Sequence, residues 1–136
     1  MKISHLSATQ IEYCDTGRSI YHQITESDAA PDVRALQAIF DWCRKQKWSS
    51  ERLEERPQVV ALGIGFGDFL CPRIDAQWVW AEDAEAEHSD FALQIANTQT
   101  LIWPFAVITK RILQDENTTI LGVIEGIEAA LQNLEN

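Results

Sequence analysis

Mainly hydrophobic side chains recur with a helical period over residues 31–48. The positions that share one face of that helix are Val33, Leu36, Phe40, Cys43 and Lys47, with Ile39 and Trp42 widening the stripe. Pro31 suits the first turn of a helix, and the basic Arg44, Lys45 and Lys47 in the last turn complement the helix dipole. We therefore predict a helix over residues 31–48.

The N-terminal segment carries the signals that begin a helix. Ser7 and Gln10 have the spacing of a capping box, in which each side chain bonds the backbone amide of the other residue. Leu6 and Ile11 have the spacing of a hydrophobic staple across the same turn. We predict a helix from Ser7 to about Tyr21.

Residues 57–70 fit two patterns. Apolar residues alternate with alanine and glycine, as in a strand, but Val59, Leu62 and Phe66 also share one face of a helix. Neither glycine-rich phosphate-binding pattern is present, and Asp68 has no neighbouring catalytic partner. Periodicity leaves strand and helix open, and we expect the alternating glycines to permit close packing. They are Gly63, Gly65 and Gly67.

The middle of the chain alternates with the period of strands. The predicted strands are 77–82, 91–96 and 99–103. Asn97 and Thr98 suit a tight turn between the second and the third. We predict a small antiparallel meander of about three strands within residues 76–103.

Residues 104–136 predict two helices. Pro104 begins a short helix to about Leu113, and Asp115-Glu116-Asn117 is a turn whose last residue caps the final helix. Gly122 and Gly126 lie one turn apart, so we expect a neighbouring element to approach closely there. The apolar positions of the final helix are Ile120, Ile124, Ile127, Leu131 and Leu134.

Length and composition are those of one globular domain. The chain has 136 residues, of which 46% are hydrophobic and 24% charged, enough to close a single core. The sequence contains no internal repeat and no segment with the composition of a linker between domains. We predict a single α+β domain over residues 1–136, with the meander packed against four to five helices.

The net charge of −10 is unevenly spread. Residues 1–73 hold nine basic and ten acidic residues, whereas residues 74–136 hold two basic and eleven acidic residues. A field of this sign repels nucleic acid and anionic lipid, so neither is an expected partner. It favours a basic protein partner, or it keeps the protein soluble.

Cysteine usage and hydropathy indicate a cytoplasmic protein. Cys14, Cys43 and Cys71 are odd in number and form no C-x-x-C pair, so we expect free thiols rather than a disulfide framework or a zinc site. We expect no signal peptide, no membrane-spanning segment and no cofactor.

Five carboxylates fall within nine residues: Glu82, Asp83, Glu85, Glu87 and Asp90. The segment lacks the glycine and the spacing of a calcium loop, so we expect no metal. It is either a solvated hairpin loop or a docking surface for a cationic partner. We place the candidate partner-binding residues here, with Trp78 and Trp80, which either fill the core side of the sheet or form an exposed aromatic surface.

Catalytic signatures are absent from the sequence. His5, His22 and His88 stand in no metal-binding or nucleophile-activating frame, and His88 lies beside the acidic segment. We therefore expect a protein that is not an enzyme and has no catalytic residues.

Residues 58–113 resemble a bacterial family of domains of unknown function. The matching residues are 62–68 (LGIGFGD), 77–83 (QWVWAED) and 104–111 (PFAVITKR). The resemblance implies a glycine-containing helix over 57–71, a Trp-rich strand, an acidic hairpin, a second strand and a Pro-led helix ending in Lys-Arg. It implies no activity. Residues 84–90 depart from the glycine-containing hairpin of that pattern.

Three hypotheses for function follow. The first is a protein-interaction module, most specifically an immunity-type protein that neutralises a toxin by covering its basic cleft with an acidic surface. The second is a structural or regulatory domain that acts as a homo-oligomer through the glycine-notched C-terminal helix. The third is an enzyme whose site is assembled from scattered residues.

Overall fold

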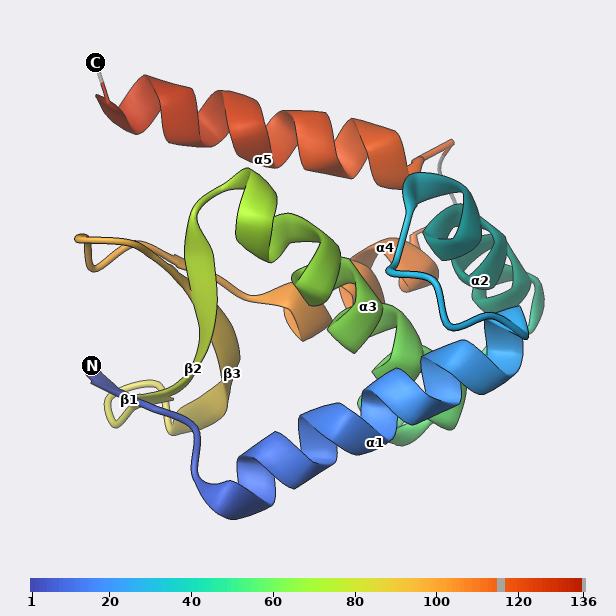
Figure 1. Ribbon diagram of the computed structural model, residues 1–136, viewed down its shortest axis with the longest axis horizontal. Helices are drawn as coiled ribbons and strands as arrows, with labels where there is room; N and C mark the ends of the chain where they lie inside the picture. Colours follow the sequence, from blue (N-terminus) through green and yellow to red (C-terminus); the bar gives the residue numbers. More distant parts are fainter. Residues whose placement is uncertain (115–116, 136) are drawn as a thin grey trace.

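The computed structural model describes residues 1–114 and 117–135, with the backbone alone at Glu135. The chain forms an α+β domain, as predicted (Figure 1). Its elements are β1 (Lys2–Ser4), α1 (Ala8–Thr25), α2 (Val33–Lys45), the 3-10 turn η1 (Leu53–Glu55), α3 (Pro57–Arg73), β2 (Ala76–Asp83), β3 (His88–Ile95), β4 (Leu101–Ile102), α4 (Pro104–Leu113) and α5 (Ile120–Glu135).

The sheet is an antiparallel meander with one added strand. Its order is β1-β2-β3-β4, so each strand pairs with its neighbour in sequence. The predicted three-stranded meander is confirmed, and its third strand is shorter than the 99–103 expected. The sequence analysis missed β1, which pairs Lys2 with Glu82 and Ser4 with Trp80.

The two faces of the sheet are covered differently. The face toward the helices carries the large side chains Trp78, Trp80, Phe91, Leu93 and Ile102. The other face carries the small side chains Val79, Ala81 and Ala92, which are buried beneath Ile3, Leu101 and Trp103. All the helix packing is therefore on one face of the sheet (Figure 1).

α3 is the centre of the core. It runs through the middle of the molecule, and it contacts α1, α2, α4 and β2 (Figure 1). Every residue from Val59 to Gly67 is buried. The helix implied by the family resemblance over 57–71 is thus confirmed, and the strand alternative is wrong. The alternating pattern arises because the helix is buried on all sides.

The glycines of α3 permit close packing, as expected. A Cβ built at Gly63 would lie 2.6 Å from the Phe105 ring of α4, and one at Gly67 would overlap the indole of Trp78. Three glycines two residues apart point in three directions around a helix. Each of the three glycines therefore packs against an aromatic ring from a different element of the fold.

The helix starts agree only partly with the predictions. The capping box is confirmed, since the Ser7 hydroxyl accepts from the Gln10 amide and the Gln10 side chain accepts from the Ser7 amide. α1 runs past Tyr21 to Thr25. In α2 the cap is Asp32, whose carboxylate accepts from the Ala35 amide at 2.8 Å. The placement of Pro31 in the first turn is therefore wrong.

The start of α5 also differs. The Thr119 hydroxyl, not Asn117, accepts from the Gly122 amide at 3.0 Å and caps the helix, because it lies directly before Ile120. The predicted turn residues Asp115 and Glu116 lie outside the described residues.

The expected close approach at Gly122 and Gly126 is wrong. A Cβ at Gly126 would meet nothing within 4 Å outside its own helix. α5 is anchored instead through its N-terminal half, where Ile120, Val123 and Ile124 are buried. Within the described ranges, no helix has the length and apolar character needed to cross a membrane.

Candidate functional site

The acidic segment forms the β2–β3 hairpin. Glu82 and Asp83 end β2, Glu85 and Glu87 lie in the turn, and Asp90 lies on β3. The turn has no glycine. Asp83 accepts from the amides of Glu85 (3.2 Å) and Ala86 (3.3 Å), and Glu87 takes the left-handed conformation at φ 49°. The Asp83 carboxylate therefore stabilises this turn by capping its amides. Glu87 adopts a positive φ, a conformation that glycine adopts at a lower energetic cost.

None of the five hairpin carboxylates forms an ion pair within the part of the chain that the structure describes. Glu82, Glu85 and Glu87 are exposed. Lys2 stands opposite Glu82 in the β1–β2 register, but the Glu82 carboxylate accepts instead from Trp80 Nε1 at 3.2 Å. The negative charge of the hairpin therefore remains largely unneutralised.

Asp90 connects the hairpin to two other elements. Burial raises the pKa of its carboxyl, and the negative charge of Glu54 raises it further, while the Phe91 amide and His88 act against the shift. Tyr13 of α1 stacks on Phe91, with ring centroids 5.1 Å apart. Burial raises the pKa of Tyr13, and Asp90 and Glu54 add to the increase.

Tyr13, Glu54 and Asp90 are close enough for their charges to interact, and together with the other hairpin carboxylates we call them the acidic surface. Its members are Tyr13, Glu54, Glu82, Asp83, Glu85, Glu87 and Asp90. The sequence analysis missed Tyr13 and Glu54, because both lie far along the chain from the hairpin and no local pattern links them. Glu55 lies beside this surface but is paired with Arg52.

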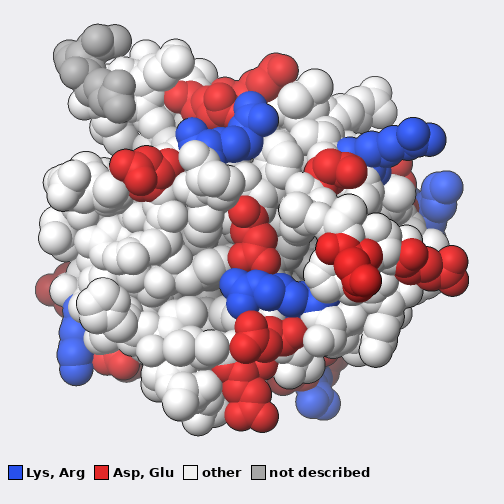
Figure 2. Space-filling view, viewed as in Figure 1, with Lys and Arg blue, Asp and Glu red and all other residues white. Residues whose placement is uncertain are grey.

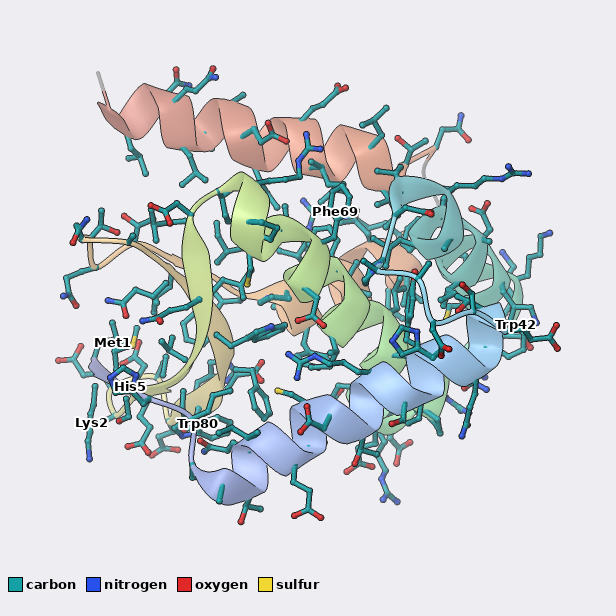
Figure 3. The ribbon with its side chains drawn as sticks, in the orientation of Figure 1. Met1, Lys2, His5, Trp42, Phe69 and Trp80 are labelled. Atoms are coloured by element: carbon teal, nitrogen blue, oxygen red, sulfur yellow. The ribbon has the colours of Figure 1, made fainter. Side chains whose placement is uncertain are left out.

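Trp78 and Trp80, the other candidate partner-binding residues, face the helices. The Trp78 indole donates to Asp68 Oδ1 at 2.9 Å, and the Trp80 ring meets Phe91 edge-on with centroids 5.1 Å apart. Trp80 lies at the corner of the molecule that also holds Met1, Lys2 and His5 (Figure 3). Both indoles therefore lie on the side of the sheet that faces the helices.

Asp68 joins three elements. Arg18 of α1 donates to both of its oxygens, from Nε to Oδ2 at 2.8 Å and from Nη2 to Oδ1 at 3.0 Å. Arg18 also pairs with Asp15 at 2.8 Å. The face shown in Figure 2 accordingly carries basic groups flanked by acidic ones rather than a field of one sign. We interpret Asp68 as a structural residue that ties α1, α3 and β2 together.

The reactive side chains show no catalytic grouping among residues 1–114 and 117–134. Burial raises the pKa of Cys14, Cys43 and Cys71 to about 11 each, so the thiols are protonated at neutral pH. The His22 ring bonds the Ser27 carbonyl at 2.8 Å, and the His88 ring lies 5.4 Å from that of Trp103. No three potential metal ligands come together there.

Two apolar hollows lie away from the acidic surface. One, of about 590 Å³, lies between α1 and α2 against Ile24, Ala38, Ile39 and Trp42. Trp42 is 45% exposed at the end of the molecule away from Trp80 (Figure 3). The other, of about 630 Å³, lies between α5 and β4. The sequence assigned Trp42 to the stripe of a helix and did not anticipate either hollow.

Comparison with known proteins assigns the chain to a family but not to a function. Residues 32–123 match the family DUF3806, a domain of unknown function. The match runs from the cap of α2 to the buried part of α5. No curated protein and no solved structure matched the chain.

Proposed function

The chain belongs to the DUF3806 family, and we propose that it is a protein-interaction module that binds a basic partner protein through the acidic surface. The observation that carries the proposal is the set of five hairpin carboxylates with no ion pair among the described residues. Unpaired carboxylates attract a cationic surface over long range and speed its association.

Tyr13 adds an anchor to this surface. It is 40% exposed, and its ring is held in place by stacking on Phe91. Tyrosine is enriched at the energetic centres of interfaces because it buries a large area and loses little side-chain entropy. A rigid aromatic ring surrounded by carboxylates suits a partner with exposed Arg or Lys side chains.

The protein acts by binding and not by catalysis in this proposal. The protonated thiols of Cys14, Cys43 and Cys71 support it, since the thiolate is the nucleophilic form. Three free thiols also suit a reducing compartment, and we place the protein in the cytoplasm.

The most specific form of the proposal is an immunity-type protein that covers the basic cleft of a toxin. The small size and the net charge of −10 support it. In that case, coexpression of the protein with its captured partner suppresses the toxicity of the partner. Suppression fails if the acidic surface is reversed in charge.

A homo-oligomeric structural or regulatory domain is the second candidate. The open space at Gly126 favours it, because a second copy has room to approach α5 there. Sedimentation at high protein concentration separates the two candidates. A protein that stays monomeric at every concentration would contradict the homo-oligomeric candidate.

Reversing charge at the turn tests the proposed function. The partner is captured from the native host and identified, and its affinity is then measured by calorimetry at low and high salt. We expect the double variant Glu85→Lys with Glu87→Lys to weaken binding at least tenfold at low salt, and high salt to weaken the native complex. Each lost interaction with a basic group removes part of the electrostatic attraction.

The matched control is the double variant Glu26→Lys with Asp28→Lys. It changes the net charge equally, it uses exposed positions two residues apart, and Glu26 has nearly the same backbone conformation as Glu87 (φ 53° against 49°). We expect this control to bind within about twofold of the native protein. Equal losses in both double variants would show that only net charge matters and would overturn the acidic surface as the contact.

A further inference from the structure

β4 is one of the two edge strands of the sheet, and β1 is the other. The register pairs Leu93 with Ile102 and Gln94 with Leu101, and the Ile95 amide donates to the Thr100 carbonyl at 3.1 Å. In an antiparallel pair, alternate residues direct both backbone groups to the partner strand. Thr100 and Ile102 therefore face β3, and Leu101 directs its N–H and C=O outward. Neither group of Leu101 has a partner among the described residues.

The outward edge of β4 opens into a groove beneath α5. The groove of about 630 Å³ is lined by Leu101, Ile102, Ile127 and Leu131, and it also reaches Gly122 and Gly126. A second hollow of about 520 Å³ continues beneath the same helix, where Ile74 and Ile95 line it. Figure 1 shows the C-terminal half of α5 running above the β3–β4 hairpin.

The C-terminal half of α5 is less buried than its N-terminal half. Leu134 is 68% exposed, Leu131 is half-buried, and Gly126 has open space where a side chain would stand. The Arg73–Glu128 ion pair (2.8 Å) holds this half at its distance from α3. An apolar helix face held above an unpaired strand edge has the two parts of a strand-addition site: backbone groups for affinity and apolar pockets for side chains.

We propose that the groove beneath α5 binds an extended segment of a partner protein, which adds to β4 as a fifth strand. The proposal rests on the proposed function, since the segment belongs to the same basic partner. Every second side chain of the segment points toward Ile127 and Leu131, and its backbone bonds the N–H and C=O of Leu101.

Charge favours such a partner over a second copy of this chain. Residues 74–136 contain eleven acidic and two basic residues, and residues 112–136 contain no Lys or Arg. Arg111 lines the groove and Arg73 is already paired with Glu128, while the exposed Asp75 and Glu125 nearby form no ion pair among the described residues. Two copies joined at β4 would bring two acidic halves together, whereas Lys or Arg flanking the bound segment would be attracted.

The groove and the acidic turn lie at opposite ends of β3. Its eight residues span about 26 Å at roughly 3.3 Å per residue. One partner can therefore contact both, since an interface of ordinary size covers about 800 Å² on each protein. In this arrangement the acidic surface steers the partner and the groove holds its extended segment.

Two variants block the groove, and Gly126→Leu does so without removing a packed side chain, whereas Leu101→Pro also removes the Leu101 side chain that packs beside Val79 and Ala92. Leu101→Pro removes the outward N–H, which β3 does not use, and a sheet edge tolerates proline on its free side. Gly126→Leu places a side chain in the groove at a position where a Cβ meets nothing within 4 Å. Ala129→Leu is the matched control, because it is exposed on the same helix and does not line the groove.

The probe is a library of random twelve-residue peptides displayed on phage and selected on the native protein. We expect enriched peptides rich in Lys or Arg with alternating apolar residues. They should bind Leu101→Pro and Gly126→Leu at least tenfold more weakly, and Ala129→Leu equally well. In the nitrogen-15 spectrum, the Leu101 amide should shift downfield and become protected from exchange. Thermal unfolding confirms that each variant folds.

Three results would overturn the proposal: no enriched peptide is sensitive to the two blocking variants, the Leu101 amide is unchanged on binding, or the native protein is a dimer that Leu101→Pro dissociates. The last result would identify a second copy as the occupant. Salt-dependent capture of a basic partner that is lost in the double variant at Glu85 and Glu87 would still support the proposed function. Failure of that capture would overturn the proposed function instead.

Discussion

α3 and α5 both contain glycines, but the space beside these glycines is filled in α3 and open in α5. In α3, Gly63 and Gly67 receive the rings of Phe105 and Trp78, so the missing side chain is replaced by a neighbour. In α5, Gly126 faces open space, and Gly122 meets only the hydroxyl of its own cap, Thr119, at 3.1 Å. Glycine in a helix therefore marks close packing only where a neighbour fills the gap.

The difference follows from burial. Glycine lowers helix stability by roughly 0.5–1 kcal/mol relative to alanine, wherever it stands. In α3 this loss is offset, because the helix is surrounded and each gap admits an aromatic ring. In α5 no contact offsets it among the described residues, and the gap stays open as part of the groove. Substitutions at the two kinds of glycine should therefore have opposite signs.

The largest effect is expected at Gly67. Gly67→Ala places a methyl group inside the indole of Trp78, so the ring moves and its bond to Asp68 breaks. We expect a loss of about 2–3 kcal/mol in the free energy of unfolding, the upper part of the range for overpacked cores. Urea denaturation followed by Trp fluorescence measures it. A loss below about 0.5 kcal/mol would show that α3 has room to yield and would remove the contrast with α5.

The second effect concerns Asp68, which holds Trp78 over Gly67. Asp68→Asn keeps the shape of the side chain but removes the charge that Arg18 bonds at 2.8 Å and 3.0 Å. We expect a loss of about 1–2 kcal/mol, since the pair is charged but only half-buried. A double-mutant cycle with Gly67→Ala measures the coupling. Additive losses would mean that Trp78 reaches its position without Asp68.

The smallest effect has the opposite sign. Gly126→Ala adds a methyl group in open space within a helix, so we expect a gain of about 0.5–1 kcal/mol from helix propensity alone. Chemical denaturation measures it against the native protein. A loss of stability would show that another group occupies the space above Gly126 in solution, as it would in an oligomer.

Local signals predicted the local features of the fold. The capping box at Ser7 and Gln10 and the alternation of β2 and β3 each lie within one element, and the structure confirms them. The stripe of α2 is confirmed from Val33 to Cys43, whereas Trp42 is 45% exposed and Lys47 lies beyond the end of the helix. The cap of α2 was misplaced because both Pro31 and Asp32 suit a helix start, and the capping bond of Asp32 decides between them. β1 was missed because three residues are too few to show a period.

The site depends on contacts between distant residues, which no local pattern reports. Asp68 and Arg18 lie 50 positions apart, and Tyr13 stacks on Phe91 although the two are far apart along the chain. The hairpin carboxylates were predictable because they are neighbours in sequence. Their lack of ion pairs, and the outward backbone groups of Leu101, follow only from the fold.

The position of β1 sets an order of folding. β1 pairs Lys2 with Glu82, so β1 is synthesised before its partner strand, which follows 80 positions later. The β2–β3 hairpin closes a short loop and forms in about 1–10 μs, whereas closing the long loop costs more chain entropy. The sheet should therefore grow outward from its hairpin, with the N-terminal strand docking onto β2 only after that hairpin has formed.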